Sequence, residues 1–174
     1  MEFSSDVILK GSNWKKALEG LKIFFPDKSM QPNYSLYIIS VAVGIMYDKQ
    51  LDIAGFEDKT EDNLYVPRTI LHNHGSDLEF LFQTAILTSK LSTLDKKQKM
   101  DLAFNANSDI EFKKMDFLTK FGNFGVGIIL EQITDNPIET MENFKEFIFR
   151  TFEGKNYSVY GVSDDDLDIT DLSI

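Results

Sequence analysis

The sequence predicts an all-α fold, with a single compact domain of about six helices and a mobile acidic C-terminal tail. The 174 residues include only 10 glycines and 4 prolines, which favours long regular elements. Apolar residues make up 43% of the chain and 15 residues are Phe, so we expect a phenylalanine-rich core. Apolar positions also recur with a helical period along most of the chain. We expect the helical domain over residues 1–160 and the tail over 161–174.

The N-terminal part predicts two helices. Residues 1–11 are irregular or form one short strand, and a short helix over 14–24 then ends before Pro26. A second helix begins near Pro32 and runs to about Lys49. It is apolar nearly all round, which is typical of a buried helix. Its longest nearly apolar run is 14 residues, and a bilayer span needs about 20, so we expect a core helix.

Residues 50–75 have no helical period and carry charges, Gly and Pro. We interpret them as a long surface connection, in which short strands are possible at 51–54 and 65–66.

The second half contains four helix-start signals. Ser76 with Glu79, and Ser108 with Glu111, have the form of capping boxes, and Asp95 can cap a short helix. Asn136, a cap residue, is followed by Pro137, and this pair predicts the start of the last helix. We expect these helices to end near residues 90, 105, 132 and 152. Polar and apolar residues alternate over 155–162, which predicts a short strand there. The side chains predicted to point inward are Met100, Ala103 and Phe104 in the second of them, and Met141, Phe144, Ile148 and Phe152 in the last.

The helix predicted over 109–132 is the central buried element, and it contains Gly122, Gly125 and Gly127. Each glycine inside a helix costs about 1 kcal/mol relative to alanine, so close packing must offset that cost. The order of these glycines matches neither Gly-rich phosphate-binding fingerprint. Ser40 and Gly44 are four residues apart and share one face of the second helix. We therefore predict that the Gly122/Gly125 face packs on Ser40/Gly44.

The formal net charge of −10 argues against direct nucleic-acid binding as a main activity, because such binding depends on Lys and Arg. The absence of cysteine excludes a disulfide scaffold, a thiolate metal site and a cysteine nucleophile. The first residues lack the pattern of a signal peptide, so we expect a cytoplasmic protein. No serine lies in a nucleophile elbow, and we find no positive sign of an enzyme and predict no cofactor.

Two groups of residues raise other possibilities. His72 and His74, with Asp77 or Glu79, could supply nitrogen and oxygen ligands to a metal, although we favour two ordinary loop histidines and predict no metal site. The lysines of the second group could form a local nucleic-acid contact, but interleaved acids make an ordinary charged surface the better interpretation. That group comprises Lys96, Lys97, Lys99, Lys113 and Lys114.

Candidate partner-binding residues lie along the central helix and in the tail. The helix residues form a thin polar line, for which a solvated face is the simpler interpretation. The tail interleaves acids with Leu and Ile, as in segments that fold on a basic partner, and a solubilising tail is the alternative. The candidates are Lys113, Lys120, Asn123, Glu131, Asp164, Asp165, Asp166, Leu167, Asp168 and Ile169.

The order of several short motifs resembles that of the Dnd system-associated proteins, small accessory proteins of bacterial anti-phage loci linked to DNA phosphorothioation. The resemblance covers residues 13–135. The motifs are the apolar run at 34–47, Val-Pro-Arg at 66–68, Leu-Glu-Phe-Leu-Phe at 78–82, Leu-Ser-Thr-Leu-Asp at 91–95 and Phe-Gly-Asn-Phe-Gly-Val-Gly at 121–127. It implies a cytoplasmic accessory subunit that works beside a larger ATPase or nuclease, and it assigns no catalytic residue.

The sequence therefore predicts a non-enzymatic adaptor subunit of a bacterial DNA-targeting anti-phage defence complex, which binds a larger ATPase or nuclease. Two alternatives remain open at this point. One is an acidic inhibitor or DNA mimic that acts on a nuclease, and the other is a small metal-dependent hydrolase that uses the His72/His74 loop.

Overall fold

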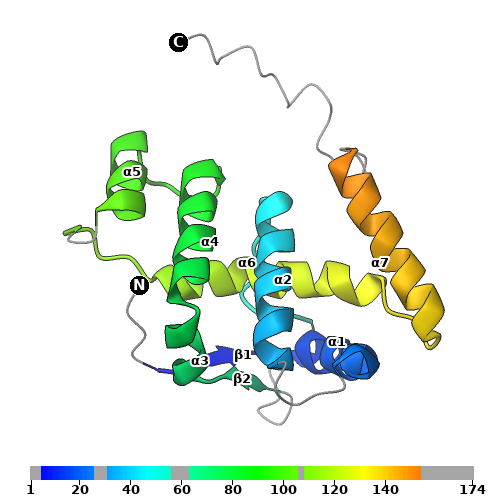
Figure 1. Cartoon of the computed structure of the whole chain (residues 1–174). Helices are drawn as coiled ribbons and strands as arrows, with labels where there is room; N and C mark the ends of the chain where they lie inside the picture. Colours follow the sequence, from blue (N-terminus) through cyan, green and yellow to red (C-terminus); the bar gives the residue numbers. More distant parts are fainter. Residues whose placement is uncertain (1–4, 26–30, 56–62, 106–107, 154–174) are drawn as a thin grey trace. The chain divides into compact units, whose positions relative to one another are not determined.

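The structure is a computed structural model, and it describes residues 5–25, 31–55, 63–105 and 108–153 (Figure 1). In these residues, seven α-helices accompany one two-stranded sheet, which confirms the predicted all-α class. The elements are β1 (Val7–Leu9), α1 (Ser12–Leu21), the 3-10 helix η1 (Lys22–Phe24), α2 (Pro32–Met46), β2 (Leu64–Val66), α3 (Arg68–Asn73), α4 (Gly75–Thr88), α5 (Lys96–Phe104), α6 (Lys114–Glu131) and α7 (Pro137–Phe152).

The chain divides into two compact units, Met1–Glu131 and Gln132–Ile174, so α7 belongs to the second unit. The sequence predicts one domain over 1–160, and the boundary expected after residue 160 lies outside the described residues. Among those residues, no helix is both long enough and apolar enough to cross a membrane.

The crossing of α2 and α6 forms the centre of the first unit (Figure 1). A Cβ atom on Gly125 would lie 2.8 Å from the carbonyl carbon of Ser40 and 2.9 Å from the backbone nitrogen of Gly44. A Cβ on Gly44 would lie 2.6 Å from the carbonyl carbon of Phe121. The two backbones therefore touch at Gly125, Ser40 and Gly44, and the predicted contact is confirmed for Gly125 but not for Gly122. Gly122 instead faces side chains, with its Cβ position 3.2 Å from the Cγ2 of Val41.

The core around this crossing is mainly aliphatic. Trp14, Tyr37, Phe82 and Phe121 are its largest fully buried side chains, and the others are Leu, Ile and Val. Phe82 and Phe121 are the phenylalanines buried to this degree among the described residues, whereas Phe80 and Phe104 are more than 60% exposed. The expectation of a phenylalanine-rich core is therefore wrong. The fully buried positions on α2 and α6 are filled mostly by smaller side chains, which suit a close crossing.

In the segment predicted as a surface connection, the described residues 50–55 and 63–75 contain more regular structure than expected. Residues 64–66 form β2, which pairs antiparallel with β1 and confirms the strand predicted near 65. Residues 68–73 form α3, which is not predicted, because the segment carries charges, Gly and Pro and has no helical period. Residues 51–54 form no strand. The backbone N–H of Leu51 donates to the carbonyl oxygen of Lys120, and Ala54 is fully buried.

Two of the four predicted helix starts are confirmed. Asp95 caps α5 in a reciprocal capping box with Gln98, and the Asn136 side chain accepts from the backbone N–H of the second residue of α7. The capping boxes predicted at Ser76 and Ser108 are wrong, although α4 does start beside Ser76, at Gly75. The N-cap of α4 is His74, with no side-chain cap, and α6 starts at Lys114 rather than near residue 109. The Ser108 hydroxyl donates to the carboxylate of Asp101 instead of capping a helix.

The predicted inward faces of α5 and α7 need correction. In α5, Ala103 is buried as expected, but Met100 is 46% exposed and Phe104 is 63% exposed, while Leu102 is buried. In the second unit, Met141 and Ile148 are exposed and Phe144 is half-buried. The side chain of Phe152 and the strand predicted over 155–162 lie outside the described residues. Helical periodicity identifies an apolar face, but it does not show that another element covers that face.

Candidate functional site

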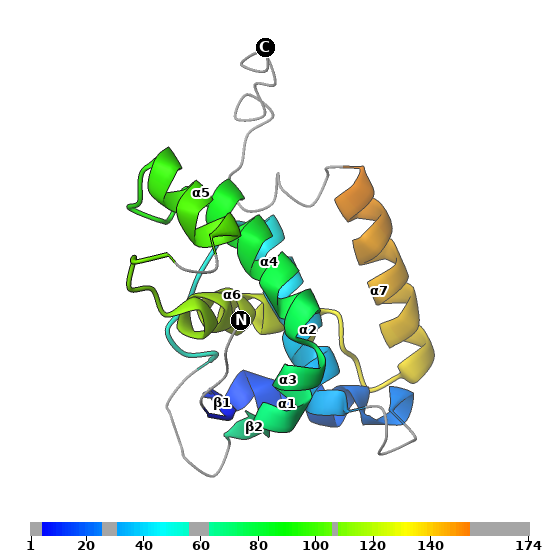
Figure 2. The same cartoon turned by 60° about the vertical axis from the view of Figure 1, so that its left-hand side comes forward.

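The end of the first unit that carries α5 contains two hollows. In Figures 1 and 2, α5 lies beside the C-terminal part of α4, away from α3 and β2. The larger hollow has a volume of about 1150 Å³ and is bounded by β1, α4, the end of α5 and the start of α6. We call it the polar pocket. Its charged and amide-bearing lining residues include Asp6, Glu79, Gln83, Lys113, Lys114 and Asp116.

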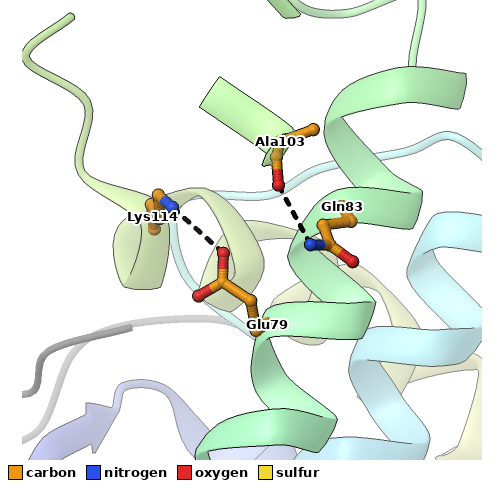
Figure 3. Close-up of polar contacts among 4 residues, drawn as sticks. All are labelled: Glu79, Gln83, Ala103 and Lys114. Carbon is orange, nitrogen blue, oxygen red and sulfur yellow. Dashed lines mark hydrogen bonds and ion pairs between the residues drawn. The ribbon is translucent and has the colours of Figure 1, made fainter. Parts of the chain in front are cut away.

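Helix α4 holds two walls of the polar pocket together. Glu79 and Gln83 are four residues apart and therefore share one face of the helix. Figure 3 shows the Glu79 carboxylate facing Lys114, whose Nζ donates to Oε1 at 3.1 Å. Figure 3 also shows the Gln83 amide facing α5, where Nε2 donates to the carbonyl oxygen of Ala103 at 3.0 Å. These two bonds tie the start of α6 and the end of α5 to α4.

The Glu79–Lys114 ion pair is partly shielded from solvent, with side-chain exposures of 25% and 26%. Lys114 Nζ also lies 4.6 Å from the centroid of the Phe82 ring, a cation–π geometry. Burial raises the pKa of the Glu79 carboxyl, but hydrogen bonds and charges from positive groups that include Lys114 outweigh it, and the net pKa is lowered. A carboxylate held in its ionised form by a cation suits structural anchoring better than proton transfer.

The second hollow, which we call the apolar groove, has a volume of about 710 Å³ and lies along α5. Phe104 and Asn105 line both hollows, so the polar pocket and the apolar groove meet there. The exposed side chains of Phe104 and Met100 form part of its wall, opposite the buried face of α5. The residues that line it are Lys97, Gln98, Met100, Asp101, Phe104, Asn105 and Ile110.

Hydrogen bonds connect α5 to the described residues on both sides of residues 106–107. Asp101 accepts from the side-chain amide of Asn105 and from the hydroxyl of Ser108. The bond from Ser108, and then the bond from Asn105, lower the pKa of Asp101. The same Ser108 hydroxyl accepts from the backbone N–H of Ile110. These bonds link Asp101, on α5, to Asn105 and Ser108, and Ser108 to Ile110, which lines the apolar groove.

The structure separates the predicted polar line on α6. Lys113 is exposed and lines the polar pocket, whereas Lys120 forms an ion pair with Asp52 at 2.6 Å. Glu131 is exposed at the last residue of the helix. An 18-residue helix is about 27 Å long, so these side chains do not form one surface. The six candidate tail residues, Asp164, Asp165, Asp166, Leu167, Asp168 and Ile169, lie outside the described residues.

Asn123 requires a correction, because it is only 2% exposed and does not face a partner or solvent. Its Oδ1 accepts from Trp14 Nε1 at 3.0 Å, and its Nδ2 donates to the carbonyl oxygens of Leu51 and Asp52 at 3.0 and 2.9 Å. Asn123 lies on α6 and thus connects this helix to α1 and to the segment that follows α2. A buried amide satisfied on both ends stabilises the fold and is not available to a partner.

Each of the two histidines has its own partners among the described residues. His72 Nε2 accepts from the Arg68 guanidinium at 3.2 Å, while the His74 ring stacks on Tyr34 and pairs with Asp77 at 3.3 Å. Glu79 points to Lys114 instead. Within the described ranges, no group of three potential metal-binding side chains is present. The hydrolase hypothesis, which depended on a metal at this loop, is therefore not supported by the geometry.

The five lysines also do not act as one basic patch. Lys99 Nζ donates to the carbonyl oxygen of Ser89 at 2.6 Å, and Lys114 pairs with Glu79. Lys96, Lys97 and Lys113 remain on the exposed surface.

Comparison of the chain with protein-family models, with curated proteins and with solved structures finds no match. The site is therefore interpreted from its own geometry. In that geometry, the exposed side chain of Phe104 lies where the polar pocket and the apolar groove meet.

Proposed function

We propose that this protein is a non-enzymatic adaptor that binds a larger protein through the apolar groove and Phe104. The observation that carries the proposal is the position of Phe104, a side chain 63% exposed at the junction of two hollows. An exposed aromatic side chain beside a recess is typical of the anchors that dominate protein–protein binding energy. Met100 adds a flexible apolar side chain to the same groove.

The biological setting of the proposal comes from the resemblance over residues 13–135. On that basis the adaptor belongs to a cytoplasmic bacterial defence complex that targets phage DNA, and the partner is its ATPase or nuclease. Direct contact with DNA is secondary in this proposal, because the net charge is −10 and the five lysines do not form one patch.

Affinity capture from the organism that encodes the chain tests the proposal. The bait is the full chain, with Phe104→Ser as the test variant and Ile39→Ser as the matched control, because Ile39 is 51% exposed on α2 and lines neither hollow. Mass spectrometry identifies the partner, which is then purified and mixed again with each bait. We expect the wild type and Ile39→Ser to bind it, and Phe104→Ser to lose most of the binding.

Equal binding by all three baits would overturn the assignment of the groove. A different result would favour the acidic-inhibitor hypothesis. In that case the captured partner is a nuclease, the chain inhibits it, and the inhibition is lost only when residues 163–174 are deleted.

A further inference from the structure

Helix α7 of the second unit is held on one side by the turn that precedes it (Figure 2). The Thr140 hydroxyl donates to the carbonyl oxygen of Thr134 at 3.2 Å. The side-chain amide of Asn143 donates to the carbonyl oxygen of Gln132, also at 3.2 Å. Thr140 is buried, and Phe144, one turn further along the same side, is half-buried. The opposite side of α7 makes none of these contacts.

That opposite side carries large apolar side chains at coiled-coil spacing. Ile138, Met141, Ile148 and Phe149 are each more than half exposed. Together with Lys145, the first three follow one another at intervals of three, four and three residues, which is the a/d repeat of a coiled coil. Phe149 lies beside them at an e position. We call these five residues the α7 seam, and a row of exposed apolar side chains on one helix is typical of a surface that binds another helix.

Two charged residues occupy the a, d, e and g positions of α7, and they have opposite signs. Lys145 lies at an a position in the middle of the α7 seam, and Glu142 lies at a neighbouring e position. Both side chains are exposed, and neither has an ion pair or hydrogen bond with another residue that the structure describes. The surface therefore offers one ammonium group and one carboxylate, so its charge selects neither an acidic nor a basic partner.

We infer that the α7 seam binds the α7 seam of a second copy of the chain, with the two helices antiparallel. In an antiparallel pair the a residues of one helix pack against the d residues of the other, so Lys145 packs against Met141 of the second copy. Ile138 packs in the same way against Ile148. The a and e residues of both copies share one edge of the pair, so Lys145 lies beside Glu142 of the second copy. Two-fold symmetry forms this ion pair twice and leaves neither charge unpaired.

Other occupants match the α7 seam less well. A parallel pair of copies would bring the two Lys145 side chains together, and like charges repel. An acidic partner helix would face Glu142 with a like charge, and a basic one would do the same to Lys145. A 16-residue helix is about 24 Å long and holds little more than two heptads, so we expect a dimer with a Kd in the micromolar range. The inference concerns α7 alone and does not rest on the proposed function.

Sedimentation equilibrium of the full chain, over a concentration series through the micromolar range, tests the inference. We expect a monomer–dimer equilibrium whose Kd rises about tenfold or more with Ile148→Ser, because an apolar side chain of the seam is lost. Lys145→Glu and Glu142→Lys should each raise Kd about tenfold. The two changes combined should restore Kd to within about threefold of wild type, because the ion pairs form again with their signs exchanged. Arg150→Glu makes the same charge change outside the seam and is the matched control, which should leave Kd unchanged.

Circular dichroism of each variant separates loss of pairing from unfolding of α7. A chain that is monomeric throughout the series, or a dimer that Ile148→Ser leaves unchanged, would overturn the inference. A double charge reversal that fails to restore pairing would overturn it as well. If the chain is monomeric and Ile148→Ser abolishes capture of a different protein, the α7 seam belongs to that protein and the inference is equally wrong.

Discussion

Replacing Gly125 by alanine tests the close crossing of α2 and α6 at the centre of the first unit. The added Cβ would fall 2.8 Å from the carbonyl carbon of Ser40 and 2.9 Å from the nitrogen of Gly44, both of them backbone atoms. Neither atom can move away by a rotamer change, so α2 and α6 must separate. Carbon atoms pack best at about 3.5–4.0 Å. If the two helices move apart by about 1 Å, each van der Waals contact between them loses roughly a quarter to a half of its energy.

The expected loss follows from two opposing effects. Overpacking of a core costs about 1–3 kcal/mol, and a backbone clash places Gly125→Ala at the upper end of that range. Alanine regains about 1 kcal/mol of helix propensity relative to glycine. We therefore expect a net loss of about 2 kcal/mol, which for a protein of this size lowers Tm by roughly 6 °C.

The assay is thermal and urea unfolding followed by circular dichroism. Gly127→Ala is the matched control on the same helix, because its Cβ would lie 3.9 Å from the Nδ2 of Asn13, an ordinary contact. That variant should gain up to about 1 kcal/mol from helix propensity. If Gly125→Ala is as stable as wild type, or if both variants shift Tm equally, the close crossing of α2 and α6 is refuted.

Four further predictions concern single positions in the first unit. Gly122→Leu should destabilise the fold by several kcal/mol in urea titrations, because a Cβ alone already lies 3.2 Å from Val41, whereas an unchanged midpoint would contradict this packing. Asn123→Ala should cost about 3 kcal/mol by leaving Trp14 and two carbonyl groups unpaired, whereas Lys120→Ala, which removes an exposed ion pair, should cost under about 1 kcal/mol. The lowered pKa of Glu79 stabilises the fold above the ordinary Glu pKa, and this contribution is lost as the pH falls through the lowered value. The stability gap between wild type and Glu79→Gln should therefore narrow from pH 7 to pH 3, and a constant gap would exclude the ion pair as its cause. Asp95→Ala should cost about 1 kcal/mol and accelerate amide exchange mainly in α5, whereas uniform acceleration would show that α5 does not open separately.

Much of the fold could be predicted because local chemistry decides it. The cap at Asp95 and the Asn-Pro start of α7 act within one turn of the chain, and they place the starts of α5 and α7 correctly. The glycine contact could also be predicted, since only close packing offsets glycines in a helix. The capping box predicted at Ser108 is wrong because the Ser108 hydroxyl donates to the carboxylate of Asp101, which lies outside the four-residue pattern. A pattern of four residues contains no information about such a competitor.

The candidate site was predictable only in part. Lys113 was among the predicted partner-binding residues and does line the polar pocket. The spacing of Met100 and Phe104 in α5 predicts an inward face, whereas both side chains are exposed. Which face of a nine-residue helix is covered depends on how α4 packs against it, and the sequence of α5 does not contain that information. Glu79 was interpreted as a cap residue, and its true partner, Lys114, is 35 residues away.

Hydrogen–deuterium exchange of the full chain, alone and with its purified partner, tests the central claim most directly. The claim is that the partner docks on the apolar groove, which α5, Asn105 and Ile110 line. We predict that binding slows exchange in residues 96–105 and 110–116, and that Phe104→Ser abolishes this protection. Slower exchange confined to α1, to α2 or to residues 163–174, with α5 unchanged, would contradict the account.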